Sequence, residues 1–179
     1  MTKEEQFVVN PLIRWFKRQN AAWQIHKPRF GTAATGWDIE ARRNHMDLLI
    51  EAKYINGAFL TSFTGLVTAS LAKRPQHFMV TKYRSWCYYV CWAIGTSYTQ
   101  RNIFQILFDY IARNPQFWKH YAEDVRMKYL FFVQDGQVKR VPFLRMLRLA
   151  EQYAERAKGK SLPERRAIAG TLMTKFRRL

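Results

Sequence analysis

The sequence is poor in cysteine, histidine and acidic residues, and each scarcity argues against a class of protein. Two cysteines, Cys87 and Cys91, and four scattered histidines do not make up the ligand set of a zinc finger. We expect both thiols to be buried and reduced, as is usual in a cytosolic protein. There is also no glycine-rich phosphate loop and no Ser-His-Asp arrangement, so a nucleotide-driven motor or an acyl-transfer enzyme has no support.

Long hydrophobic runs are absent as well. The longest apolar stretch, residues 58–72, is interrupted by Thr, Ser and Gly and is too short to span a bilayer. The first five residues are polar and acidic, unlike a signal peptide. We therefore expect a soluble, cytoplasmic protein, either nucleoid-associated or phage-encoded, without a membrane partner.

Positive charge is the abundant feature. The 179 residues include 30 Lys and Arg against 13 Asp and Glu, which gives a net charge of +17. Residues 139–179 alone carry 12 basic against 3 acidic side chains. Such an excess favours a polyanionic partner, because neutralising phosphates releases counterions. Nucleic acid is the first expectation and a membrane surface its rival.

The first half of the chain predicts a helix, three strands, a helix and a fourth strand. The Thr2-Lys3-Glu4-Glu5 run has the pattern of a capping box, and Asn10-Pro11 either kinks or restarts the helix. Apolar periodicity and turn residues then predict strands at 22–26, 38–43, 46–53 and 86–94, and a helix at 60–73.

The central feature is the hairpin formed by residues 38–53. Alternation along a strand places Asp38 with Glu40 on one face and Glu51 with Lys53 on one face of the next strand. If Asp38 lies opposite Glu51, then Arg43 lies opposite Met46, which leaves a two-residue turn, a favoured hairpin length.

Two carboxylates side by side are unfavourable unless a cation lies between them. Mg²⁺ suits such a place, since it takes carboxylate, water and phosphate oxygens. The ammonium of Lys53 reaches the same spot and could stabilise a phosphate under attack or orient a water molecule. An ordinary hairpin with an exposed Glu–Lys pair would carry similar residues. However, the apolar run Leu48-Leu49-Ile50 predicts a buried strand, in which ionisable groups are rarely without a role.

Asp38 followed by Glu51-Ala52-Lys53 at the end of a hydrophobic strand resembles the signature of the PD-(D/E)xK nuclease superfamily. Trp37 stands where that family often has proline. The resemblance covers about the first half of the chain. It implies an α/β fold with a restriction-endonuclease-like mixed sheet of four or five strands, flanked by helices. Residues 1–96 would form the nuclease core.

The resemblance also implies site residues. Asp38, Glu51 and the main-chain carbonyl of Ala52 would hold Mg²⁺, with Mn²⁺ as a substitute, and Lys53 would act on the phosphate or the water. Family members often have a further acid on the first helix, which Glu5 or Glu4 could match; Glu5 is taken as the candidate, and Glu40 ranks after it. Lys73 or Gln76 could be a helper residue, although a solvated turn is the favoured interpretation for both.

Residues 97–179 extend beyond the resemblance. Helices are expected at 102–113 and 116–124, followed by a hairpin around Asp135-Gly136, a strong turn signal. This hairpin either adds to the sheet or forms a small lobe. A basic amphipathic helix from residue 143 and a helix opened by a capping box at Ser161 complete the chain. This helical, basic C-terminal extension is expected to face nucleic acid.

The sequence thus predicts a Mg²⁺-dependent endodeoxyribonuclease. Its relatives in function would be Holliday-junction resolvases, phage endonucleases and transposon end-cleaving subunits, so a homodimer or a partner protein in a DNA-processing complex is expected by analogy. Two alternatives stay open: a catalytically inactive nucleic-acid-binding module of the same fold, and a nuclease acting on RNA.

Overall fold

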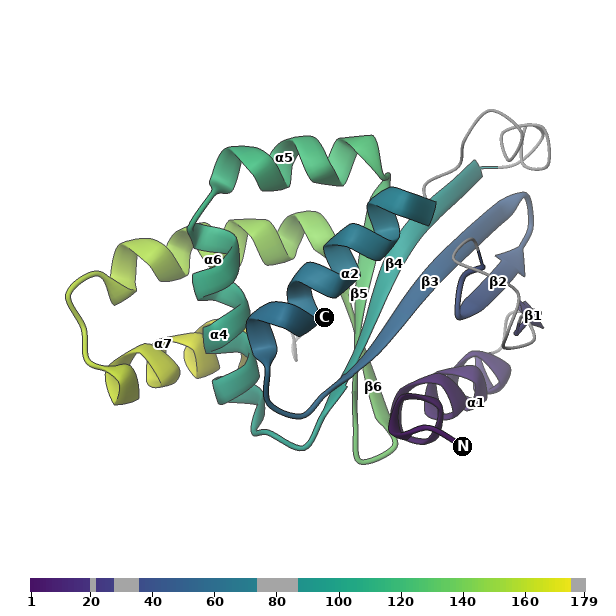
Figure 1. Ribbon diagram of the computed structural model, residues 1–179, viewed down its shortest axis with the longest axis horizontal. Helices are drawn as coiled ribbons and strands as arrows, with labels where there is room; N and C mark the ends of the chain where they lie inside the picture. The colour runs from purple at the N-terminus through teal and green to yellow at the C-terminus, as the bar shows by residue number, and fades with distance from the viewer. Residues whose placement is uncertain (20–21, 28–35, 74–86, 175–179) are drawn as a thin grey trace.

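A six-stranded mixed sheet, with strands in the order β1-β2-β3-β4-β5-β6, organises the chain (Figure 1). The computed structural model describes residues 1–19, 22–27, 36–73 and 87–174. The strands are β1 (Gln24–His26), β2 (Ile39–Arg43), β3 (Met46–Ile55), β4 (Cys87–Thr96), β5 (Met127–Gln134) and β6 (Gln137–Pro142). The helices are η1 (Glu5–Val9), α1 (Asn10–Arg18), α2 (Phe59–Lys73), α4 (Gln100–Ala112), α5 (Pro115–Asp124), α6 (Phe143–Ala157) and α7 (Leu162–Thr174).

The sheet combines two kinds of pairing. Strands β1, β2 and β3 are antiparallel, β3, β4 and β5 are parallel, and β6 returns antiparallel to β5. The helix α2 makes the crossover between the parallel strands β3 and β4, as parallel pairing requires. The expected α/β class with a mixed, helix-flanked sheet is confirmed. The sheet has six strands rather than four or five, because β5 and β6 continue it beyond β4.

The first hairpin has the predicted register, and the second turns at the predicted residues. Arg43 lies opposite Met46, and the turn residue Asn44 has a left-handed φ of 46°, which asparagine tolerates better than most residues. In the second hairpin Asp135 and Gly136 have φ angles of 51° and 73°. These two positive angles match the tight turn that Asp-Gly favours.

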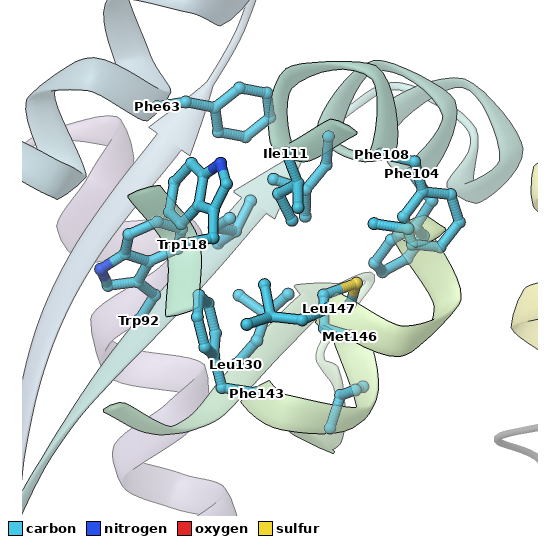
Figure 2. Packing of buried hydrophobic residues seen from close by; sticks show 14 of the residues in the cluster. Phe63, Trp92, Phe104, Phe108, Ile111, Trp118, Leu130, Phe143, Met146 and Leu147 are labelled. Carbon is cyan, nitrogen blue, oxygen red and sulfur yellow. The ribbon is translucent and has the colours of Figure 1, made fainter. Parts of the chain in front are cut away.

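The two faces of the sheet are covered unequally. η1 and α1 cover one face, whereas α2 and α4–α7 lie on the other (Figure 1). On the thicker side Trp92 of β4 packs edge-on against Trp118 of α5 and Phe143 of α6, with ring centroids 5.9 and 5.4 Å apart (Figure 2). Aromatic pairs of this geometry add to the stabilisation from buried area. The indole N–H of Trp92 also donates to the Ser70 hydroxyl of α2 at 3.1 Å, which links α2 to this layer.

Two predicted capping boxes are present. The hydroxyl of Thr2 accepts a hydrogen bond from the Glu5 N–H at 3.1 Å, and the N–H of Ser161 donates to the Glu164 carboxylate at 2.8 Å. The chain therefore enters both terminal helices as the sequence predicts. The first helix differs in one respect: its first turn is a π-helix that gives way to α1 at Asn10.

A polar cluster ties the last helix to the rest. The Asp109 carboxylate of α4 accepts hydrogen bonds from the Tyr153 hydroxyl of α6 at 2.9 Å and from Arg165 of α7. Asp109→Ala is expected to lower the free energy of unfolding by about 2 kcal/mol, the range for losing hydrogen bonds to a charged group. Urea unfolding measures this. Glu155→Ala, at an exposed position of α6, is the control and should change stability much less.

The two thiols differ from expectation. Cys91 is buried and free, and burial raises the pKa of its thiol to about 12. Cys87 is free but exposed, so the expectation that both are buried is wrong for Cys87. It is the first residue of β4, where the strand emerges from the packed layers.

Within the described ranges, no helix is both long and apolar enough to cross a bilayer.

Candidate active site

The predicted site lies where β2 begins and β3 continues past it. The last paired residues of β2 and β3 are Ile39 and Ile50. Asp38 comes just before: its N–H donates to the Ile50 carbonyl at 3.1 Å, and its Oδ2 accepts from the Ala52 N–H at 2.7 Å. Asp38 is thereby fixed beside Glu51, as the predicted register requires. The side chain of Asp38 takes the place of a backbone partner for strand β3.

Glu51 makes a close ion pair with the end of α2. Its Oε2 lies 2.6 Å from Nζ of Lys73, and each side chain is only 13% exposed. The interpretation of Lys73 as part of a solvated turn is therefore wrong. Lys73 is the last residue of α2, which runs back across β3 and delivers its ammonium to the carboxylate. Trp37 is buried beside it, with the Lys73 Nζ 5.9 Å from its ring centroid.

Glu4, at the start of the first helix, is electrostatically coupled to the same group. Its charge raises the pKa of Glu51, and the pKa of Glu4 is in turn raised by burial and by Asp38. A glycine makes this placement possible. At Gly95 of β4 a Cβ would lie 2.6 Å from the Val8 side chain and 3.3 Å from the Phe7 carbonyl. Only a residue without a side chain lets η1 approach the sheet this closely.

The three acids all hold their protons more tightly than usual. Burial and then the charge of Asp38 raise the pKa of Glu51 to about 7, against the opposing effect of Lys73. Burial raises the pKa of Asp38, opposed by the Ala52 N–H, Lys73 and Lys53. The charge of Lys53 likewise lowers the pKa of Glu4, against the effects of burial and Asp38. Buried carboxylates whose pKa values are raised, next to two lysines, are more typical of a functional site than of a surface ion pair.

Other candidates lie elsewhere or beyond what is described. The Glu5 carboxylate contacts Lys27, whose hydrogen bond lowers the pKa of Glu5. Glu4, not Glu5, is therefore the acid of the first helix that is electrostatically coupled to Asp38 and Glu51. Glu40 lies opposite His26 and lines a separate hollow of about 270 Å³. Gln76 is outside the described residues.

The oxygen atoms of the described site residues suit a hard cation, although they supply only part of its ligands. Among the residues with described positions, no group of three or more His, Cys, Asp and Glu is close enough to hold a metal. Two carboxylates plus solvent and a phosphate suffice for Mg²⁺, which usually keeps several waters. Asp38 and Glu51 use one oxygen each in the hydrogen bonds described above. Because the N–H and C=O of a strand residue point to the same side, the Ala52 carbonyl also faces Asp38. These three residues fit Mg²⁺ if Lys73 gives way.

Signals for Glu4 and Lys73 are present in the sequence. Val8, Leu12 and Phe16 are buried at a spacing of four, which extends back to Glu4. In α2 the buried residues Phe63, Leu66 and Ser70 continue to Lys73 at helical spacing. In both helices the buried stripe therefore ends on the ionisable residue that reaches the site.

Comparison of the chain with protein-family models, with curated proteins and with solved structures gives no match. The functional assignment therefore depends on the geometry and charge of the residues described above.

Proposed function

We propose that the protein is a Mg²⁺-dependent nuclease that hydrolyses DNA phosphodiester bonds. The observation that carries this proposal is the pair of carboxylates, Asp38 and Glu51, side by side on neighbouring strands with Lys53 two residues further along β3. The order helix, three antiparallel strands, helix, parallel strand supports the restriction-endonuclease-like fold that the motif implies.

Each residue has a role in this proposal. Asp38, Glu51 and the Ala52 carbonyl hold the cation, which when bound supplies positive charge against the phosphate oxygens. Lys53 stabilises the negative charge that builds up on the phosphate, or orients the attacking water. A water oxygen attacks phosphorus and releases a proton to solvent, the phosphorus–oxygen bond to the leaving nucleotide breaks, and the leaving oxygen takes up a proton from solvent. Lys73 holds Glu51 before the cation binds.

Positive surface supports a nucleic-acid substrate. The net charge is +17, and a hollow of about 510 Å³ at the turn between α6 and α7 is lined by Arg113, Lys158 and Lys160, besides Arg165 and its partner Asp109. Such clusters supply the sequence-independent part of binding, which weakens with salt. The C-terminal helices would then contact DNA away from the reacting phosphate.

The decisive test is a cleavage assay on linear, single-stranded and four-way-junction DNA with Mg²⁺, Mn²⁺ or EDTA. Wild type is expected to cut only with a metal, and Asp38→Asn and Lys53→Ala to lose about a hundredfold or more in rate. DNA binding, measured in parallel, should persist in both variants. Cutting that survives both substitutions would refute the site, and binding without any cutting would favour an inactive module or a nuclease that needs a partner.

Glu4 and Glu5 provide a matched pair. Glu4→Gln removes a charge coupled to Asp38 and Glu51 and is expected to slow cleavage about tenfold or more, the range for groups that support metal ligands. Glu5→Gln alters the neighbouring residue of the same helix, but its contact is with Lys27, so the rate should stay within about twofold of wild type. Equal losses in the two variants would contradict the assignment of Glu4.

A further inference from the structure

A band of tyrosines and cations lies on the face of the sheet that carries α1, at the start of β4 and β5. Tyr89 and Tyr129 point to this face, because each is two residues before a residue of the core beneath α1, Cys91 and Phe131 respectively. Both rings are half-buried and pack at the edge of that core. The helix layer ends before them, so part of each ring stays open to solvent.

Three basic side chains lie over these rings. The Arg126 guanidinium is 4.8 Å from the ring centroid of Tyr88 and 5.2 Å from that of Tyr89. The Lys128 ammonium is 4.0 Å from Tyr89 and 5.5 Å from Tyr129, and the Arg140 guanidinium is 4.8 Å from Tyr129. Cations and aromatic rings thus alternate across β4, β5 and β6. We call this set the cation–tyrosine band; its members are Tyr89, Arg126, Lys128, Tyr129 and Arg140, whereas Tyr88 packs against the core on the opposite face.

Two backbone irregularities aim the cations at the band. Cys91 lies opposite Tyr129 and Val90 opposite Met127, so a β-bulge leaves Lys128 as the extra residue. Bulges commonly redirect a side chain. Arg126 follows the end of α5 with a left-handed φ of 58°, in a position where helices usually have glycine. Its Nε donates to the Tyr88 carbonyl at 3.0 Å, which holds the guanidinium beside the rings.

The charge of the band is not neutralised by nearby acids. Within the part of the chain that the structure describes, Arg126, Lys128 and Arg140 form no ion pair with a carboxylate. A non-glycine residue in a strained conformation points to a role for its side chain. Exposed and half-buried cations interleaved with aromatic faces match the chemistry of a polyanion whose units are themselves flat rings. That polymer is single-stranded nucleic acid, since a duplex hides the faces of its bases.

We propose that the cation–tyrosine band binds a single-stranded segment of DNA. Bases stack on Tyr89, on Tyr129 and on the plane of the Arg126 guanidinium, while Lys128 and Arg140 turn towards the phosphates. The choice of DNA over RNA rests on the proposed nuclease function; the binding of a single strand does not.

The band is separate from the candidate active site. Tyr89 lies opposite Leu48 of β3, three residues before Glu51 and therefore about 10 Å along the strand. Leu48 packs in the core beneath α1, and Glu51, an odd number of residues further on, points to the other face. The band therefore does not present the phosphate to be cut. It holds a single-stranded part of the substrate at a distance from that phosphate, so a substrate with both paired and unpaired segments fits best.

The test is fluorescence anisotropy in EDTA, without cleavage, using labelled oligothymidylate of about 16 nucleotides, the upper end of known single-strand site sizes. A labelled hairpin duplex and oligouridylate are measured at the same salt. Wild type is expected to bind oligothymidylate more tightly than either. Tyr89→Leu and Tyr129→Leu keep apolar packing but lose the ring, and each should weaken single-strand binding at least about fivefold. Tyr89→Phe and Tyr129→Phe should bind like wild type.

Arg126→Gly separates stability from binding. Glycine adopts the left-handed conformation without strain, so this variant should keep a wild-type melting transition while single-strand affinity falls. Its salt dependence should also become shallower by about 0.7 in the slope of log K against log salt.

Equal affinity of wild type for single strand and duplex, or leucine variants that bind like wild type, would overturn the proposal. Tighter binding to oligouridylate would overturn the choice of DNA. The proposed nuclease fails separately: Asp38→Asn should bind oligothymidylate normally whether or not the wild type cuts DNA.

Discussion

Glu51→Gln is expected to abolish a loss of stability of about 3 kcal/mol that the wild-type protein undergoes as the pH rises from about 4.5 to 7. In the folded protein the pKa of Glu51 is raised to about 7 from its ordinary value of 4.5, chiefly by burial. Between these two values the folded state holds a proton that the unfolded state has released. The free energy of unfolding therefore falls as the pH rises through this window, and the whole loss is present above it.

Urea unfolding in EDTA at pH 5 and pH 8 measures the difference. The wild type should lose stability between the two, and Glu51→Gln should lose much less. Glu5→Gln is the control: the pKa of Glu5 is lowered by Lys27, so removing its charge should give no such gain. A wild type whose stability does not fall with pH would contradict the burial of a charged Glu51.

The same substitution should nearly abolish activity. In the proposed mechanism Glu51 holds the cation, and loss of a group that places charge against the reacting phosphate slows an enzyme by about 10² to 10³. Greater stability with lost cleavage is the combination expected of a residue that is kept for function at the expense of folding. A glutamine variant that still cut DNA at the wild-type rate would exclude Glu51 from the site.

Lys73→Met is expected to destabilise the protein by about 3 kcal/mol at pH 8 and much less at pH 5. Removing one partner of a buried ion pair leaves the other charge uncompensated, and the Lys73–Glu51 pair is only 13% exposed on each side. At pH 5 the buried Glu51 instead takes up a proton, which limits the loss. The penalty therefore grows as the pH rises.

Mg²⁺ should reverse part of this loss. A ligand that binds only the folded state stabilises it by about 2.7 kcal/mol at a hundred times its dissociation constant, so thermal unfolding with and without Mg²⁺ at pH 8 reports binding without any activity. Lys53→Met is the matched control, since Lys53 contributes charge but no ion pair among the described residues. A Lys73→Met protein unaffected by Mg²⁺ would contradict a cation site at Glu51.

Local patterns carried most of the fold prediction. The register of the first hairpin follows from a two-residue turn and alternation, and the Asp-Gly turn and both capping boxes depend on neighbouring residues alone. The continuation of the sheet through β5 and β6 was not predictable in this way. Which strand pairs with β4 depends on how α4 and α5 pack against Trp92 and Phe132, which is decided by contacts far apart in the sequence.

The same distinction between local patterns and long-range contacts applies to the candidate site. Asp38 and Glu51 are brought together by a hairpin, so their sequence spacing sufficed. Glu4 and Lys73 arrive on helices that pack against the sheet, and a single helical position decides which of two neighbouring residues reaches it. At the first helix, counting back by four from Val8 gives Glu4 and counting back by four from Val9 gives Glu5, so the buried pattern alone leaves both residues open. The π turn widens the spacing between turns, and in the structure it is Glu4 whose charge is coupled to Asp38 and Glu51.

The close approach of η1 to Gly95 has a consequence for the order in which the site comes apart. Glu4 belongs to a short helical segment at the start of the chain, whereas Asp38 and Glu51 belong to the hydrogen-bonded centre of the sheet. Short helical segments that pack on the outside of a sheet open with lower free energies than its central strands. Partial opening of this segment would withdraw Glu4 while the strands stay protected from hydrogen exchange. The arrangement of all three acids is thus lost at a lower free energy of opening than the sheet that carries two of them.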